Sequence, residues 1–274
     1  MSHLDVHADR IAGLIAGAGD ELPLFVTGAG VSVASGIPTF RGADPDAIWR
    51  KDDIEIATFR ALKAEPQRFW EWYARRFLSL RGKHPNAAHR ALAAIDRELA
   101  GQGRDFLLIT QNIDTLHEQA GARRLVKVHG TSDRVRCARY GCEHGAPSGS
   151  LPLPDEDLDR YAKEIAAARL PVCPACGGVM RPHVLLFDEF YTEHVDYGFD
   201  RVEAAAARAA FIAFIGTSLS VGVTAFLESA ARRRGVPALL IDPAPAPSGS
   251  GTTLSHVAAR SEELLPMVLE RIAG

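Results

Sequence analysis

The four cysteines of this 274-residue chain lie in two pairs whose spacing is that of a metal site. Two residues separate Cys173 from Cys176, with glycines directly after them, and four separate Cys137 from Cys142. Paired thiolates at such spacing bind Zn²⁺, and four protein ligands leave no open position for water. We therefore expect one structural zinc ion. Buried or free thiols are the alternative, and His144 is the replacement ligand if Cys142 cannot reach the metal.

A glycine turn that follows a short apolar run is the second group of residues with recognisable chemistry. The run Leu22–Val26 is typical of a buried strand, and Gly28-Ala29-Gly30 comes directly after it. Such a turn can bind the phosphates of a dinucleotide. However, Val33 stands where the pattern G-x-G-x-x-G has its third glycine, and Ile37-Pro38-Thr39-Phe40-Arg41 continues as a turn and a loop. The sequence thus predicts a nucleotide site unlike that of a dehydrogenase.

The elements that must position these residues are apolar runs that alternate with helical stretches. Because most of the runs are continuously apolar, they indicate strands covered on both faces, in a doubly wound, mostly parallel α/β sheet. The other predicted strands are Phe106–Thr110, Leu125–Val128, His183–Phe187, Ala210–Ile215 and Pro237–Ile241, and the predicted helices include Ala87–Leu99, Val202–Ala209 and Ala225–Arg234.

Small or hydrogen-bonding residues follow five of these six strands. In open α/β sheets, ligands bind beyond the carboxyl ends of the strands. One such group alone could be turn chemistry, but five at one edge indicate a ligand site. The groups are Gly28-Ala29-Gly30, Gln111-Asn112-Ile113-Asp114, His129-Gly130, Gly216-Thr217-Ser218 and Asp242.

Two regions interrupt the alternation and are predicted to form a smaller domain. Residues 43–83 are helical and rich in aromatic side chains, and residues 131–181 hold the cysteines and a polar helix, Glu156–Ala168. The segments 1–42, 84–130 and 182–274 are assigned to the sheet domain.

The composition places the chain among ordinary globular proteins, with 47% hydrophobic and 24% charged residues. A formal net charge of -3 gives no basis for a nucleic-acid partner. The first ten residues lack a secretory signal, and no apolar run approaches the roughly 20 residues that span a bilayer. We expect a cytoplasmic protein without a membrane partner.

The chain resembles the sirtuins, the NAD-dependent protein lysine deacylases, from about Leu22 to Pro266. Six features carry the resemblance in the same order: GAGVSVASGIPTFRG, TQNIDTLHEQAG, VHG, the paired cysteines, MRPHVLLFDE and GTSLSV. The resemblance implies a Rossmann-like NAD-binding domain and a smaller domain made of a helical module and a zinc ribbon. NAD and an acylated lysine would meet between the two.

The resemblance also implies which residues contact NAD. Asn112 and Asp114 would hold the nicotinamide end, and the carboxylate of Asp242 can accept hydrogen bonds from both hydroxyls of the adenosine ribose. The implied cofactor-binding residues are Gly28, Ala29, Gly30, Ser32, Ile37, Phe40, Arg41, Gln111, Asn112, Ile113, Asp114, Gly216, Thr217, Ser218, Asp242 and Ser261.

The histidine after the predicted strand Leu125–Val128 matches the catalytic histidine of the sirtuins. The sirtuin reaction requires a ribose hydroxyl to lose a proton, and a neutral imidazole with a pKa of about 6.5 suits that transfer. His129 is therefore the implied general base, with Asn112 as the second catalytic residue; a turn-capping histidine is the alternative. The implied products are nicotinamide, free lysine and an O-acyl-ADP-ribose.

Two positions depart from the common sirtuin pattern. Thr39 stands where most sirtuins have aspartate, and Asp188 replaces a glycine in the segment that pairs with the substrate backbone by strand addition. A carboxylate at that position is expected to change peptide preference or approach. The implied substrate-binding residues are Ala57, Tyr73, Arg76, Val184, Phe187 and Asp188.

Helical spacing places Tyr73 and Arg76 on one face of a helix, where a phenol and a guanidinium can bind a carboxylate. The stretch resembles the sirtuin branch that removes succinyl, malonyl and glutaryl groups, which has a Tyr-x-x-Arg pair and a small pair matched by Ala57-Thr58. We expect succinyl or malonyl groups to be preferred and acetyl groups also to be removed. Ordinary helix core is the alternative, and a shift of one residue would promote Arg75 over Arg76.

Other functions stay open at this point. A sirtuin-like ADP-ribosyltransferase would share the NAD pocket, and a plain deacetylase would share the whole mechanism. A non-enzymatic NAD-binding module or a flavin-type electron carrier needs neither a histidine at the strand end nor a zinc ribbon. Release of nicotinamide in the presence of NAD and an acyl-lysine peptide distinguishes the deacylase, the ADP-ribosyltransferase and the non-enzymatic module.

Overall fold

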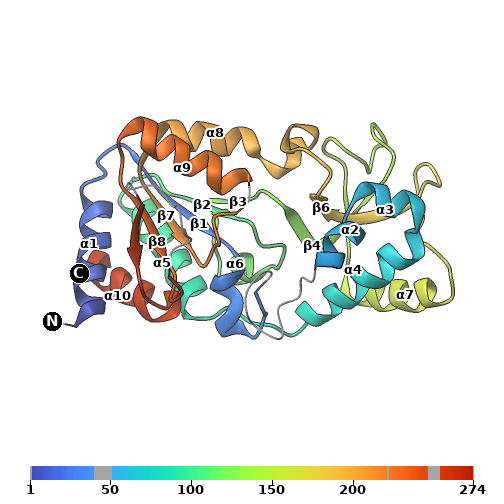
Figure 1. Cartoon of the computed structure of the whole chain (residues 1–274), viewed down its shortest axis with the longest axis horizontal. Helices are drawn as coiled ribbons and strands as arrows, with labels where there is room; N and C mark the ends of the chain where they lie inside the picture. Colours follow the sequence, from blue (N-terminus) through green and yellow to red (C-terminus); the bar gives the residue numbers. More distant parts are fainter. Residues whose placement is uncertain (1, 40–50, 221, 246–253, 274) are drawn as a thin grey trace.

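The structure is a computed structural model that describes residues 2–39, 51–220, 222–245 and 254–273. At its centre lies a six-stranded parallel sheet in the order β3-β2-β1-β7-β8-β9 (Figure 1). The chain builds β1, β2 and β3 outward in one direction and then returns to place β7 on the other side of β1. This reversal is a topological switch point, where open α/β sheets bind ligands. The strands are β1 Leu22–Thr27, β2 Leu107–Thr110, β3 Leu125–Lys127, β7 Ala209–Ile215, β8 Ala238–Ile241 and β9 Leu254–Val257.

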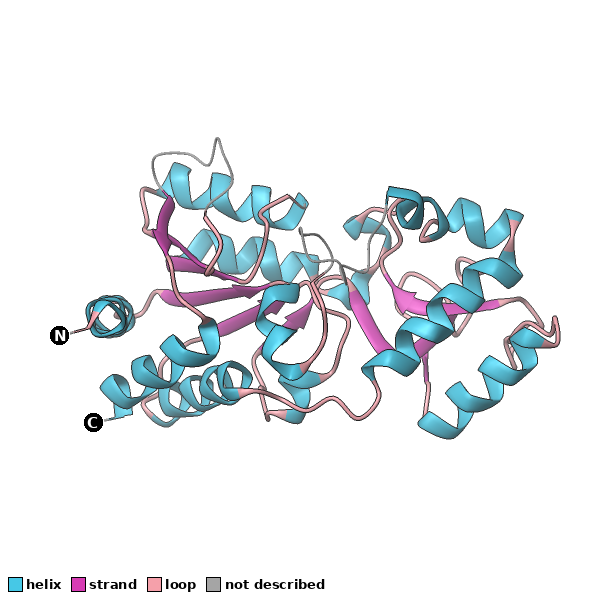
Figure 2. Cartoon of the chain, turned by 60° about the horizontal axis from the view of Figure 1, so that its bottom comes forward, coloured by secondary structure: helices cyan, strands magenta, loops and turns pink. Residues whose placement is uncertain are grey.

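Helices cover both faces of this sheet (Figure 2). One hydrophobic core lies between the sheet and α1 (His3–Ala16), α5 (Ala87–Gly101) and α10 (Ser261–Ala273). A second core lies on the other face, under α8 (Phe199–Arg208) and α9 (Gly222–Arg234). Every residue of β1 is buried, as a continuously apolar strand between two helical layers must be. The predicted doubly wound α/β fold is therefore confirmed.

A smaller, antiparallel sheet in the order β5-β4-β6 lies beside the large one, on the right of Figure 1. Four helices accompany it and share one hydrophobic core with its strands, so the aromatic-rich and cysteine-bearing regions pack together. Trp70 is fully buried in this core, and its indole N–H donates to the carbonyl of Met180 at 2.8 Å. The elements are β4 Gly130–Cys137, β5 Leu151–Pro152, β6 Met180–Val184, α2 Lys51–Ile56, α3 Phe59–Ala64, α4 Pro66–Leu80 and α7 Asp155–Ala166.

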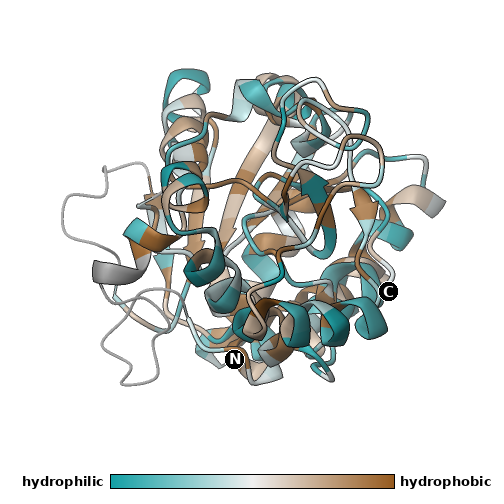
Figure 3. Cartoon of the chain, turned by 90° about the vertical axis from the view of Figure 1, so that its right-hand side faces the viewer, coloured by the Kyte–Doolittle hydropathy of each residue, from teal (hydrophilic) through white to brown (hydrophobic). Residues whose placement is uncertain are grey.

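Four short helical segments lie in the connections between these elements: η1 (Ala29–Ser35), α6 (Leu116–Gln119), η2 (Tyr191–Glu193) and η3 (Val195–Tyr197). The helices in Figure 3 carry both hydrophilic and hydrophobic residues, as amphipathic helices do. In the part of the chain that the structure describes, no helix combines the length and hydrophobicity needed to cross a membrane.

The prediction that His183–Phe187 is a strand of the large sheet is wrong. The strand here is β6, and it pairs antiparallel with β4 in the small sheet, with Cys137 opposite Met180 and Gly130 opposite Val184. An apolar run indicates burial but does not indicate which sheet buries it. Because β6 runs through residue 182, the boundary drawn there falls inside a strand; the division into two domains stays a prediction. Elements that were not predicted from the sequence include β4, β5, β9, α1 and α10.

Candidate functional site

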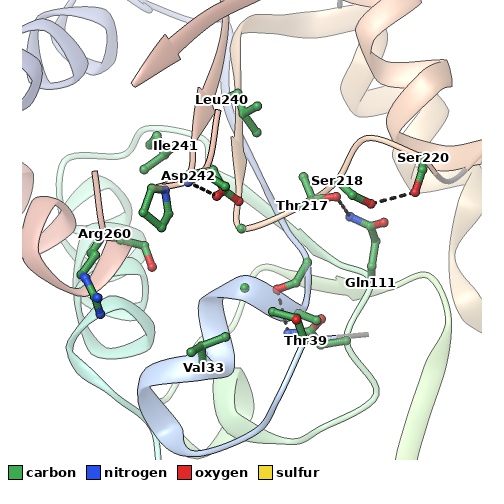
Figure 4. Close-up of a pocket in the computed structure, with 18 of the residues that line it drawn as sticks. Val33, Thr39, Gln111, Thr217, Ser218, Ser220, Leu240, Ile241, Asp242 and Arg260 are labelled. Atoms are coloured by element: carbon green, nitrogen blue, oxygen red, sulfur yellow. Dashed lines mark hydrogen bonds between the residues drawn. The ribbon is translucent and has the colours of Figure 1, made fainter. Parts of the chain in front are cut away.

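A cavity of about 560 Å³ lies at the carboxyl ends of β1, β2, β7 and β8, beside the switch point (Figure 4). The residues predicted to follow the strands meet there, although they come from distant parts of the sequence. The predicted site residues that line the cavity are Gly28, Ala29, Gly30, Gln111, Asn112, His129, Phe187, Gly216, Thr217, Ser218, Asp242 and Ser261.

The glycines allow the loops after β1 and β7 to touch. The amide of Gly30 donates to the carbonyl of Gly216 at 2.8 Å, and a Cβ on Gly30 would lie 2.6 Å from the Cα of Gly216. Val33, in place of a third glycine, is 46% exposed and lines the cavity. It therefore does not have the close helix–strand packing that the third glycine of the pattern allows. Both loops also line the cavity, so their backbone lies where it can contact a bound nucleotide.

Asn112 is fixed by buried hydrogen bonds beneath the cavity. Its amide nitrogen donates to the carbonyl of Gly28 and to the hydroxyl of Ser32, both at 3.1 Å. The Ser32 hydroxyl in turn donates to Asp114 at 3.0 Å. Nearer the cavity, the side-chain amide of Gln111 donates to Thr217 at 3.2 Å. Ser32 and Asp114 thus contribute by holding Asn112 and are not among the lining residues of the cavity.

The structure places the other predicted cofactor residues differently. Ile37 and Ile113 are buried in the protein, at 5% and 8% exposure, and neither lines the cavity. The predicted contacts of Phe40 and Arg41 lie outside the described residues. Lining residues that the prediction did not include as cofactor contacts are Val33, Thr39, Ser220, Leu240, Ile241, Pro243, Ala244, Pro245, Arg260 and Glu262.

Two buried histidines extend the network under Asn112. His89 lies 3.5 Å from the Ser32 hydroxyl, and His117 lies 3.0 Å from the Thr27 hydroxyl. Burial lowers the pKa of His89 to about 4, against the opposing charge of Asp114, and lowers the pKa of His117 well below its usual value. The only sequence signal for His89 is its place three residues after Asn86, which caps α5 by accepting the amides of Ala88 and His89. This capping pattern is not specific to a functional site. Both rings are neutral at pH 7.

Acid is expected to destabilise the protein through His89 and His117. Their pKa values are lower in the folded chain than the unfolded value of about 6.5. Their contribution to stability is therefore present above about pH 6.5 and is lost as the pH falls below it, in the case of His89 toward its folded pKa of about 4. Each pKa unit corresponds to about 1.4 kcal/mol of unfolding free energy. Denaturant unfolding between pH 7 and pH 4.5 should show a steep loss of unfolding free energy as the pH falls. The loss should be shallower in His117→Gln and unchanged in the control His3→Ala. Equal slopes of unfolding free energy against pH in the two variants would contradict this.

His129 lies at the wall of the cavity, between β3 and β4, and its ring has two hydrogen-bond partners. Nδ1 is 2.9 Å from the carbonyl oxygen of Gln111, and Nε2 is 2.9 Å from the hydroxyl of Tyr191. A carbonyl can only accept, so Nδ1 carries the proton and Nε2 has the free electron pair. Burial lowers the pKa of His129 to about 4, and the bond to Gln111 acts in the opposite direction. The ring is therefore neutral at pH 7, as a general base must be.

The four cysteines form one cluster whose sulfurs all lie within 4.8 Å of one another. Cys137 and Cys176 are 3.5 Å apart, Cys142 and Cys176 3.6 Å, and Cys142 and Cys173 3.8 Å. Zinc–sulfur bonds of about 2.3 Å at tetrahedral angles require sulfurs about 3.8 Å apart, so the cluster fits a tetrahedral zinc ion. His144 is not in the cluster.

The predicted acyl-binding residues lie in the core shared by the helical module and the small sheet. Tyr73 is 4% exposed and Arg76 is 7% exposed, both on the inner face of α4, whereas Arg75 is exposed. The register that the sequence could not decide therefore favours Arg76. Ala57 is buried in the same core, and its carbonyl accepts the amide of Phe187 at 3.0 Å.

Asp188 is turned toward the helical module. Its carboxylate accepts the amides of Phe59 at 2.6 Å and Arg60 at 3.1 Å, at the start of α3. An aspartate at this position thus connects the segment after β6 to the helical module. Val184, the last residue of β6, is buried in the core.

Comparisons with known proteins agree with this architecture. Residues 28–223 match the model of the Sir2 family. An NAD-dependent protein deacylase of Thermus thermophilus is 38% identical over 89% of this chain and 87% of its own length. The mitochondrial NAD-dependent protein deacylase sirtuin-5 of Danio rerio is 36% identical over 77% of this chain and 70% of its own. A crystal structure of a Sir2 homolog–NAD complex has a TM-score of 0.76 and 31% identity, and covers 97% of this chain and 93% of the other. With the family model matching most of the chain, and with a glycine turn, a strand-end histidine and a four-cysteine cluster in their expected places, the protein belongs to the Sir2 family, the sirtuins.

Proposed function

We propose that this chain, an NAD-dependent protein deacylase, prefers lysines that carry acidic acyl groups such as succinyl or malonyl. One observation carries the acidic preference: a phenol and a guanidinium, Tyr73 and Arg76, are buried side by side on the inner face of α4. Acetyl groups are expected to be removed more slowly by the same machinery.

The site offers a position for each part of the reaction. The glycine loops after β1 and β7 would hold the nucleotide, and the network around Asn112 would hold its nicotinamide end. NAD, when bound, supplies the ribose carbon that accepts the acyl group, with nicotinamide as the leaving group. Nε2 of His129 is the atom that accepts a proton from a ribose hydroxyl. Phe187 lines the cavity, and its amide donates to the carbonyl of Ala57, which is buried in the same core as Tyr73.

Tyr73 stays a neutral hydrogen-bond donor at physiological pH. Burial raises the pKa of Tyr73 far above its usual value, against the opposing charges of Arg181 and Arg76. Its hydroxyl can therefore donate to a carboxylate but cannot become a competing anion. This property suits a phenol that helps to bind an acidic acyl group.

The charges of two guanidinium groups, Arg181 and Arg76, act on Tyr73 in this core. Arg181 is paired with Glu189 through both guanidinium nitrogens, one of them at 2.9 Å. The guanidinium carbon of Arg76 lies 5.7 Å from the centroid of the Trp72 ring, a cation–π contact. A buried guanidinium binds a carboxylate through two charge-assisted hydrogen bonds, and an acetyl group offers it no such partner.

Two other functions share parts of this site. A plain deacetylase would use the same base and NAD pocket with α4 serving only as helix core. A sirtuin-like ADP-ribosyltransferase would use the NAD pocket without an acyl-lysine. Both predict no advantage for an acidic acyl group.

Arg76→Met is expected to remove the acidic preference selectively. A lost charge-assisted hydrogen bond corresponds to about 1.5–3 kcal/mol, so kcat/KM for a succinyl-lysine peptide should fall roughly 10- to 100-fold. The same value for the matched acetyl-lysine peptide should change by less than about threefold, because methionine fills a similar volume without the charge. Steady-state assays with both peptides measure this directly.

Arg75→Met is the matched control, because Arg75 neighbours Arg76 on the same helix but faces solvent. It should leave both substrates unaffected. Equal losses on both peptides in Arg76→Met would assign the residue to the helix core. A wild-type protein that favours acetyl-lysine would show that the acidic preference is wrong, while leaving the deacylase function intact.

A further inference from the structure

We propose that Tyr191 is a positioning residue for the base, whose hydroxyl holds Nε2 of His129 until a ribose hydroxyl replaces it as the hydrogen-bond donor. This inference rests on His129 being the base in the proposed function. It does not depend on which acyl group is removed.

The direction of the hydrogen bond follows from the partners of the imidazole. Nδ1 of His129 donates to the Gln111 carbonyl, so the neutral ring can only accept at Nε2. The Tyr191 hydroxyl, 2.9 Å away, must therefore be the donor. Together the two bonds fix both the tautomer and the orientation of the ring. With the Nδ1 bond alone, the ring could tilt about that bond.

The phenol ring packs against the helices that cover one face of the large sheet. The ring of Tyr191 stacks on Phe199 at the start of α8, with centroids 4.6 Å apart, and Phe199 packs against Phe226 of α9. Burial raises the pKa of Tyr191 to about 12, against a backbone hydrogen bond from Val223 at the start of α9. The hydroxyl thus keeps its proton at neutral pH and can donate to the base but cannot act as a base.

His129 faces the cavity, whereas its partner Tyr191 does not line it. His129 is among the residues that line the cavity, and Tyr191 is not among them in the described chain. Because the neutral imidazole has one electron pair at Nε2, it cannot accept from Tyr191 and from a ribose hydroxyl together. Proton transfer to Nε2 therefore requires the phenol to have been replaced. The proton passes from the ribose oxygen to Nε2, and Tyr191 keeps its own.

Two other ionisable groups, Asp114 and Glu189, have partners of their own. Asp114 accepts hydrogen bonds from Ser32 and from the amide of Leu116. Glu189, in the segment before Tyr191, is paired with Arg181. Removal of the Tyr191 hydroxyl is thus expected to change the environment of His129 and to leave these pairs in place.

The test is Tyr191→Phe, which keeps the stacked ring and removes the hydroxyl. A hydrogen bond donated to Nε2 favours the neutral imidazole and lowers its pKa, so its loss should raise the pKa of His129. Titration of ¹⁵N-labelled histidine by NMR should show a rise of about 0.5–1 unit. The affinity for ADP-ribose, measured by calorimetry, should increase roughly twofold to tenfold, because the ribose no longer displaces a donor.

Tyr140→Phe, in the exposed turn between Cys137 and Cys142, is the matched control and should change neither value. An unchanged or lower pKa of His129 in Tyr191→Phe would show that the hydrogen bond is not made in solution. Weaker binding of ADP-ribose would show that Tyr191 contacts the nucleotide instead of being replaced by it; either result overturns the inference. Neither measurement uses an acyl substrate, so both remain interpretable if the proposed deacylase preference fails.

Discussion

His129→Ala is expected to lower the turnover of acyl-lysine peptides by roughly 10²- to 10⁴-fold, the range for loss of a general base. The imidazole is neutral at pH 7, has its proton on Nδ1 and presents Nε2 at the cavity wall. Alanine offers no group that can accept the proton. Nicotinamide release and free lysine should be measured at saturating NAD and peptide, so that the loss appears in kcat.

The loss must be separated from a loss of folding. His129 is held by hydrogen bonds to Gln111 and Tyr191 and is not part of the hydrophobic cores. The variant should therefore keep its thermal unfolding transition within a few degrees and should still bind ADP-ribose. His3→Ala is the matched control, because His3 is the first residue of α1, and it should retain full turnover. Turnover in His129→Ala close to that of the wild type would remove this histidine from the mechanism.

Replacement of Cys173 and Cys176 by serine is expected to release about one zinc ion per chain and to loosen the smaller sheet. Cys137 and Cys173 are buried in the core shared by that sheet and helices α4 and α7. Structural zinc contributes apparent binding free energies of about 10–16 kcal/mol in zinc-finger peptides, which shows how much folding energy such a site can hold. Elemental analysis of the purified protein measures the metal.

Hydrogen exchange locates the effect of zinc loss. Amides of β4, β6 and α4 should lose protection, because the metal connects the two ends of the cysteine-bearing region to this core. Amides of β1 and β7 lie between the two helical layers and should keep theirs. Tyr140→Ser, in the same turn but exposed, should keep the zinc. Zinc retained in the double serine variant would place the metal elsewhere.

The outline of the fold and the identity of the reactive groups could be predicted from the sequence. Runs such as Leu22–Val26 are apolar at every position because helices cover both faces of their sheet, and that pattern is local. Cysteine spacing is likewise local, because each pair approaches one metal ion from a single turn. Polar residues at the strand ends could be placed at one edge, because parallel strands present their carboxyl ends together.

Contacts between distant segments could not be predicted, because they depend on how the elements pack and not on any local pattern. The predicted strand His183–Phe187 indicated burial, but only packing placed Val184 in the small sheet, opposite Gly130. Helix periodicity put a tyrosine and an arginine on one face, but the tertiary structure decided that Arg76 faces inward and Arg75 faces solvent. Likewise, the hydrogen bond from Tyr191 to His129 joins residues 62 positions apart, and no motif relates them. The sequence by itself thus determined which groups are available for the chemistry, and the packing of the two sheets decided which of them meet.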